Sequence, residues 1–178
     1  MRRMNWRCLA GLVGIVVVLS AVGLAVPYSG VYNVAATYPD RGLMKWAMST
    51  TMDRSVVRHA RGIKVPPLDD PAMVRLGFQH FREMCVACHG APGVEISEMG
   101  QGLSPQAPSL VETAGEWKPE ELFWLTKNGV RMTGMPAWGK THTDEQIWAV
   151  VAFTQGLPKM TAEEWEKMDK AVPALEEE

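Results

Sequence analysis

Two cysteines three residues apart, with a histidine directly after the second, place the tightest constraint on how this chain can fold. Cys85, Cys88 and His89 stand together in the run CVACH. A zinc site of this kind needs two further ligands with their own spacing, and the chain has no second cysteine pair. A thioredoxin-like pair needs a βαβ context. A plain disulfide leaves His89 unexplained, whereas covalent haem attachment uses all three side chains.

We therefore predict one haem c, attached by thioether bonds to Cys85 and Cys88, with His89 as an iron ligand. An electron carrier also needs a ligand on the opposite face of the iron, and a methionine thioether there favours the reduced state. Of the 12 methionines, Met135 is the predicted sixth ligand because the glycine and proline beside it prevent a helix and let the backbone approach the ring. Met132 is the alternative.

The N-terminal region contains an apolar run of 18 residues, from Leu9 to Val26, with Ser20 as its one polar side chain. As a helix it would span about 27 Å, close to the hydrocarbon thickness of a bilayer. Three arginines precede the run and none follows before Arg41, which predicts a cytoplasmic N-terminus and an exported remainder. A cleaved signal peptide with its site at 21–23 is the alternative, and it exports the domain as well.

Helix signals recur along the rest of the chain. Helices are expected from Arg41 to Arg61 with Asp40 as the cap, from Pro71 to Met84, and then over 119–128, 144–155 and a short segment after Thr161. No segment alternates with period two, so the fold class is all-α. The predicted divisions are a transmembrane anchor (1–29), a periplasmic stalk (30–67), the functional domain (68–160) and an acidic helix with a tail (161–178).

Charge is distributed unevenly along the chain. From residue 30 onward there are 15 basic and 20 acidic residues, which argues against nucleic acid as a partner. Between Arg41 and Lys64, however, six basic residues accompany a single acidic one, Asp53. This basic stretch either lies on anionic lipid head groups near the anchor or forms solvated helix faces. His80 and His142 are expected at the surface.

The segment 70–158 resembles the class I c-type cytochromes, of the bacterial membrane-anchored monohaem kind. The Gly-x3-aromatic-x3-Cys pattern of that family is present as Gly77, Phe81 and Cys85, and the GMPAW run matches its distal methionine loop. The resemblance implies three core helices around one haem with an exposed edge. It does not cover the anchor, the stalk helix or the acidic tail.

The resemblance also implies roles for individual residues. In this family the carbonyl of a proline orients the proximal histidine, and a leucine two residues later packs on the ring; Pro108 and Leu110 match them. In the last core helix an apolar residue comes three positions before an aromatic one, as Val150 and Phe153 do here. Trp138, beside the distal loop, is the predicted aromatic contact to the haem.

The expected function is one-electron transfer in the periplasm, with the anchor in the bacterial cytoplasmic membrane, and not catalysis. The expected partners are the lipid bilayer and redox proteins such as a quinol-oxidising complex and a terminal oxidase or reductase. A fixed electron-entry subunit of a larger membrane oxidase, reductase or dehydrogenase is the alternative. A third possibility is a haem enzyme or sensor in which Met135 leaves the iron.

Overall fold

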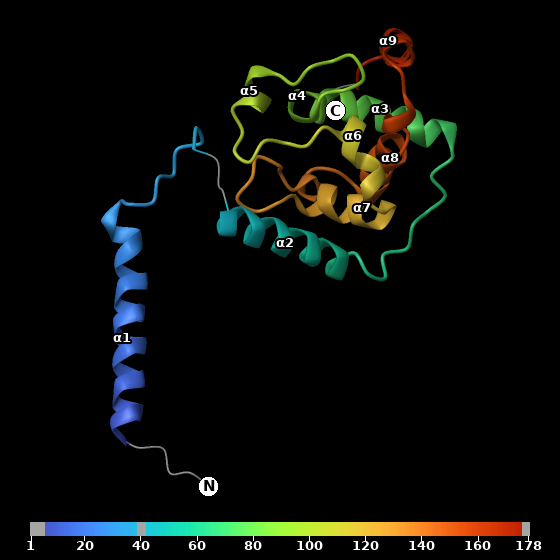
Figure 1. The fold of residues 1–178 in the computed structure, drawn as a ribbon. Coiled ribbons are helices and arrows are strands. Elements are labelled where there is room, and N and C mark those ends of the chain that lie inside the picture. Colours follow the sequence, from blue (N-terminus) through green and yellow to red (C-terminus); the bar gives the residue numbers. More distant parts are fainter. Residues whose placement is uncertain (1–5, 39–41, 176–178) are drawn as a thin grey trace. The chain divides into compact units, whose positions relative to one another are not determined.

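The computed structural model describes residues 6–38 and 42–175, and the chain divides into two compact units after Tyr38. The first unit contains one helix, α1 (Trp6–Ser29), and the second contains all the others (Figure 1). The described residues form helices and no named strand, which confirms the all-α prediction. Asp40, the expected cap of the stalk helix, lies outside the described residues.

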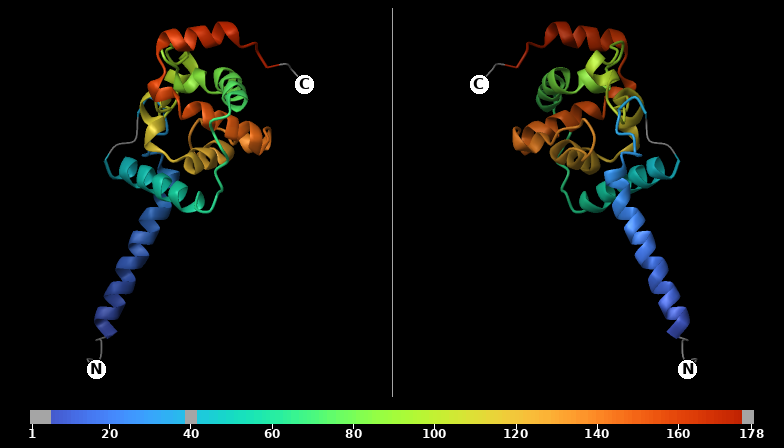
Figure 2. Two further views of the ribbon diagram at one scale, coloured as in Figure 1. Left: turned by 90° about the vertical axis from the view of Figure 1, so that its right-hand side faces the viewer. Right: turned by 90° about the vertical axis from the view of Figure 1, so that its left-hand side faces the viewer.

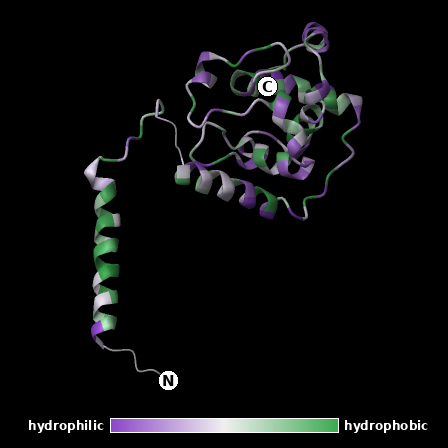
Figure 3. Ribbon diagram, viewed as in Figure 1, coloured by the Kyte–Doolittle hydropathy of each residue, from purple (hydrophilic) through white to green (hydrophobic). Residues whose placement is uncertain are grey.

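Helix α1 is apolar on all sides. Figure 3 shows hydrophobic residues along almost its whole length, and none of its side chains is buried in the protein. Its mean hydropathy reaches 2.7 over 18 residues, and it is the one described helix that is long and apolar enough to cross a membrane. A helix that is hydrophobic all round is typical of a segment that lies in an apolar environment.

The second unit begins with α2 (Gly42–His59) and α3 (Pro71–Met84). Its later elements are α4 (Val86–His89), α5 (Glu98–Gln101), α6 (Leu110–Thr113), η1 (Ala114–Glu116), α7 (Pro119–Asn128), η2 (Trp138–Lys140), α8 (Asp144–Thr154), η3 (Leu157–Lys159) and α9 (Ala162–Ala171). Helix-capping residues begin several of these helices. The Asp70 carboxylate accepts a hydrogen bond from the Ala72 amide at 3.0 Å, and capping boxes open α8 and α9.

The centre of the second unit is the crossing of α3 and α8. A Cβ atom on Gly77 would lie 1.9 Å from the Ala149 carbonyl oxygen, so only glycine allows this approach. The close crossing brings Phe78 and Phe81 of α3 against Phe153 of α8, with ring centroids 5.4 and 5.3 Å apart. All three phenylalanines are almost completely buried, and burial of such side chains is the main source of stability in a domain of this size.

A second cluster joins α7 to α8, with the Phe123 and Trp148 rings stacked at 4.1 Å. Helix α2 packs on α7, where Val56 and Ala60 are each only 1% exposed. At the opposite end of the unit from α2, α9 adds Trp165 to the phenylalanine cluster of α3 and α8 (Figure 2). The packed unit therefore extends beyond both ends of the predicted functional domain, residues 68–160.

Candidate functional site

The CVACH run forms a single tight turn at the end of α3. Cys85 closes α3 by donating its amide to the Phe81 carbonyl at 2.9 Å, and α4 follows at once. The amides of Cys88 and His89 both donate back to the Cys85 carbonyl, at 3.1 and 2.9 Å. This turn keeps the two thiols and the imidazole within one helical turn of each other, and both thiols are free.

The environment of Cys85 is apolar. The residue is 9% exposed and belongs to the core cluster of Phe81 and Phe153, on which Leu110 also packs. Burial, with a smaller contribution from the neighbouring Cys88, raises the pKa of the Cys85 thiol to about 12. An unattached thiol there would be protonated at neutral pH, which does not suit a redox-active cysteine.

His89 is held by a residue from a distant loop. Its Nδ1 lies 2.8 Å from the Pro108 carbonyl oxygen, so the tautomer with a proton on Nδ1 donates this bond and leaves Nε2 free as a ligand atom. Burial lowers the pKa of His89, and the bond to Pro108 opposes this in part. The lowered pKa favours the neutral imidazole, and the hydrogen bond fixes the orientation of its ring; a neutral, oriented imidazole is the form that binds a metal.

The loop between α7 and η2 holds Met135 by several hydrogen bonds. The Met135 amide donates to Thr133 Oγ1 at 3.1 Å, that hydroxyl donates to the Val130 carbonyl at 2.8 Å, and the Met135 carbonyl accepts from the Val130 amide at 3.3 Å. Gly129, at a φ of +64°, starts the loop, and a Cβ atom there would lie 2.6 Å from the Pro136 carbonyl oxygen. The position of Met135 along the loop is therefore closely restricted.

The two methionines of this loop differ in their surroundings. Met135 is half-buried, whereas Met132 is 79% exposed and has a left-handed φ of +62°, which is uncommon for a residue with a Cβ. Leu103, from the loop that follows α5, lies against Gly134, so the loop that leads on to Pro108 meets the loop that carries Met135. The sequence patterns did not indicate this contact or the role of Thr133.

Trp138 opens η2 and is half-buried. Its ring meets that of His142 at a centroid distance of 5.4 Å, and the His142 ring meets His80 at 5.3 Å.

The expectation that His80 lies at the surface is wrong. It is 3% exposed, with no hydrogen-bond partner for either ring nitrogen, and His142 is half-buried. The buried face of α3 includes Gly77, Phe81 and Met84, and the spacing of His80 from these residues could have indicated its burial.

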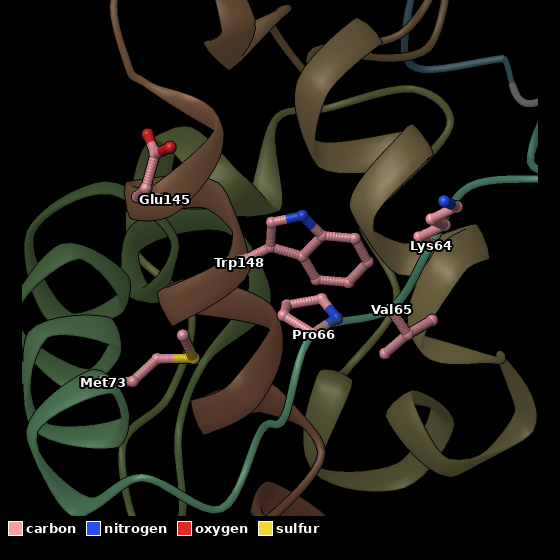
Figure 4. Close-up of a pocket in the computed structure, with 6 residues that line it drawn as sticks. All are labelled: Lys64, Val65, Pro66, Met73, Glu145 and Trp148. Atoms are coloured by element: carbon pink, nitrogen blue, oxygen red, sulfur yellow. The ribbon is translucent and has the colours of Figure 1, made fainter.

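A pocket of about 330 Å³ lies elsewhere in the second unit, between the segment after α2 and the helices α3 and α8 (Figure 4). In Figure 4 the Trp148 indole lies beside the Pro66 ring, while the Glu145 carboxylate points away from them. It contains none of the predicted site residues, and its lining offers no cluster of ligating or nucleophilic groups: Lys64, Val65, Pro66, Met73, Glu145 and Trp148. The CVACH turn and the Met135 loop remain the better candidate site.

The donor set fits a covalently attached haem. Two thiols with the attachment spacing, an imidazole with a free Nε2 and a half-buried thioether are the groups that haem c requires. Among the described residues, no group of three or more His, Cys, Asp or Glu side chains could hold a metal ion without a porphyrin. The site therefore suits an iron porphyrin better than a bare ion.

Comparison with known proteins supports this conclusion. Residues 72–153 match the family model described as cytochrome c oxidase, cbb3-type, subunit III, a family of c-type cytochromes. The chain is also 28% identical over 145 residues to a quinohemoprotein alcohol dehydrogenase of Comamonas testosteroni, a match that covers 76% of this chain and 19% of that protein. The chain therefore spans only a fifth of that relative. Residues 72–153 of this chain thus match a family of c-type cytochromes, and that family carries haem c.

Proposed function

We propose that this chain is a membrane-anchored monohaem c-type cytochrome that transfers single electrons between redox proteins. Cys85 and Cys88 would hold one haem, and His89 and Met135 would bind its iron. Bound haem c supplies an iron that alternates between the ferrous and ferric states. Helix α1 anchors the protein in the bacterial cytoplasmic membrane by a single pass and places the haem domain in the periplasm.

The observation that carries the proposal is the hydrogen bond between His89 and Pro108 beside the two free thiols. It orients the imidazole so that Nε2 is available, and it makes rotation of the ring costly. The bonds around Thr133 restrict Met135 in the same way. With both side chains restrained, a bound haem would keep the same two protein ligands in both oxidation states, which would favour electron transfer over substrate chemistry.

Further residues complete the proposed site. Leu110 packs on the cluster that contains Cys85, so its side chain is available to cover the ring beside the attachment turn. Trp138 follows Met135 by three residues and is half-buried, which supports a contact with the haem edge. Together these side chains would shield part of the ring from water, and a low local dielectric raises the potential of the iron by disfavouring the charged ferric form.

The proposed partners are a quinol-oxidising complex as the electron donor and a terminal oxidase or reductase as the acceptor. The anchor would confine the carrier to the plane that contains them. A second candidate is a fixed electron-entry subunit of a larger membrane enzyme. It is favoured by the family description, which names an oxidase subunit, and by the relative, which is an alcohol dehydrogenase. Gentle solubilisation of native membranes separates the two, because a subunit co-purifies with its enzyme and a free carrier does not.

Replacement of the proposed axial methionine tests the site. The haem-loaded Met135→Ala protein should have a lower reduction potential than the parent and should bind carbon monoxide when reduced, because an axial position becomes open. Met132→Ala is the matched control, since its side chain is exposed, and it should behave like the parent. The opposite pattern would contradict the assignment of Met135. An intact mass without one attached haem would overturn the whole proposal.

A further inference from the structure

The outward face of α2 combines exposed apolar and basic side chains. Leu43 is 78% exposed, Trp46 is 62% exposed and Val57 is 39% exposed. Their spacing of three and eleven residues places them along one side of the helix, and Arg54 lies on the same side. Arg61 follows just after the end of α2, and with Val57 it borders a hollow at the start of α7. We call these five residues the outer α2 face. A row of exposed large apolar side chains that includes tryptophan is uncommon on a surface that faces only water.

The outer α2 face is held outward by the packing of the opposite side. Val56 and Ala60 are each 1% exposed where α2 meets α7, and the His59 ring stacks on Trp124 at a centroid distance of 5.5 Å. Rotation of α2 to bury Leu43 and Trp46 would expose Val56 and Ala60. The face is therefore a fixed surface of the second unit.

The charge of this region differs from that of the remaining unit. From Gly42 to Lys64 there are five basic residues, all exposed, and one acidic residue, Asp53. No described carboxylate lies within 4 Å of any of the five, as the ion pairs of the described residues all involve other cations. From residue 65 to the C-terminus the sequence has nine basic and 18 acidic residues. An anionic surface would attract the α2 side of the unit and repel the rest.

The chain itself keeps α2 near a bilayer. Helix α1 ends at Ser29 and α2 begins at Gly42. The residues between them reach at most about 45 Å when fully extended. A membrane crossed by α1 is therefore always within reach of the outer α2 face, at a high effective concentration.

We propose that the outer α2 face rests on the anionic lipid surface of the membrane that α1 crosses; this rests on the membrane anchoring in the proposed function. Leu43 and Trp46 enter the boundary between head groups and acyl chains, where tryptophan is favoured, and the arginines pair with lipid phosphates. A second attachment of this kind restricts the orientation of the haem domain relative to the membrane, and with it the side presented to redox partners.

Site-directed spin labelling of the full haem-loaded chain tests the proposal. A nitroxide is placed at Trp46→Cys, with Cys8→Ser to leave no other free thiol, and Lys167→Cys on the exposed surface of α9 is the control position. Nanodiscs contain either phosphatidylcholine alone or an equal mixture with phosphatidylglycerol. In the mixture the label at 46 should be several-fold more accessible to oxygen than to a polar nickel chelate, and the label at 167 should show the reverse.

A second experiment removes positive charge from the outer α2 face. Combining Arg54→Gln and Arg61→Gln should reduce the protection of the label at 46 several-fold in the anionic discs, while Lys167→Gln, on the distant α9 surface, should not. Equal accessibility of the two labels to the nickel chelate in both lipid mixtures would overturn the proposal. So would protection of position 46 that requires two copies of the chain in one disc, or protection only with a co-purified enzyme.

Failure of the proposed function would give a different result. If α1 does not anchor the chain, the protein elutes apart from the nanodiscs. If the haem is not attached to the two cysteines, the labelled protein has a lower mass by one haem and carries additional nitroxides. An inserted, haem-loaded chain with a water-exposed label at 46 therefore counts against the lipid contact alone.

Discussion

At the scale of single residues, His80 is a buried imidazole without a hydrogen-bond partner. Burial lowers its pKa, the neighbouring His142 adds to the effect, and Glu83 opposes it. An unfolded histidine takes up a proton near pH 6.5, and His80 in the folded chain does so only at lower pH. Above about pH 6.5 His80 therefore does not lower the free energy of unfolding. As the pH falls below that value, the unfolded chain takes up a proton at His80 that the folded chain does not, and the free energy of unfolding decreases by at most about 1.4 kcal/mol per pH unit.

His80→Leu should remove this pH-dependent part of the free energy of unfolding. We expect chemical denaturation of the haem-loaded variant to show a shallower loss of stability between about pH 7 and pH 5 than the parent. At pH 8 the variant should be at least as stable, because an apolar side chain replaces a buried polar group without partners. Parallel curves for the two proteins over this range would mean that His80 does not contribute to the acid sensitivity.

At the scale of helices, the crossing of α3 and α8 depends on the lack of a side chain at Gly77. A methyl group there would meet the Ala149 carbonyl oxygen at 1.9 Å and the Phe153 Cβ at 2.9 Å. Gly77→Ala should therefore separate the helices and destabilise the domain by about 1–3 kcal/mol or more, despite the higher helix propensity of alanine. The midpoint of guanidinium denaturation, followed by far-UV circular dichroism, measures this.

Gly115→Ala is the matched control for the helix crossing. A methyl group at Gly115 would meet Pro158 Cγ at 3.9 Å, an ordinary van der Waals distance. We expect a change within about 0.5 kcal/mol there, as for most surface substitutions. Equal effects at the two glycines would show that the close approach of α3 to α8 is not the reason that Gly77 is required.

At the scale of the whole molecule, α9 closes the end of the second unit away from α2. Arg82 of α3 donates to the Val172 and Pro173 carbonyls, each at 2.9 Å, and Trp165 is 5% exposed among the phenylalanines of α3 and α8. The hydrogen bonds of Arg82 join residues about 90 positions apart. The acidic side chains of α9 are exposed, so its hydrophobic side stabilises the domain while its surface remains charged.

Trp165→Ala should cost about 3–5 kcal/mol of unfolding free energy, the usual range for a buried aromatic side chain. Trp46→Ala provides a control with the same change of volume at a residue that is 62% exposed, and in detergent it should have little effect. The comparison uses the full haem-loaded chain in guanidinium. If both variants unfold at the same midpoint as the parent, α9 does not belong to the cooperative unit.

Local chemistry in the sequence determined the fold class and the approximate boundaries of the longer helices, whereas the short helices α4, α5 and α6 were not predicted. The Asp70-Pro71 start of α3 and the capping boxes of α8 and α9 act within four residues, and so they can be recognised without the fold. The CVACH run is equally local: all its donors lie within five residues.

Tertiary structure alone decided what depends on distant parts of the chain. It brings Leu103 against Gly134, places His80 in the interior and adds Trp165 to the core. Each of these contacts forms between helices or loops that are far apart in the sequence. Which side chains become buried depends on which surfaces are still uncovered once α3 and α8 have crossed. Residue patterns with a period of a few positions carry no information about that choice.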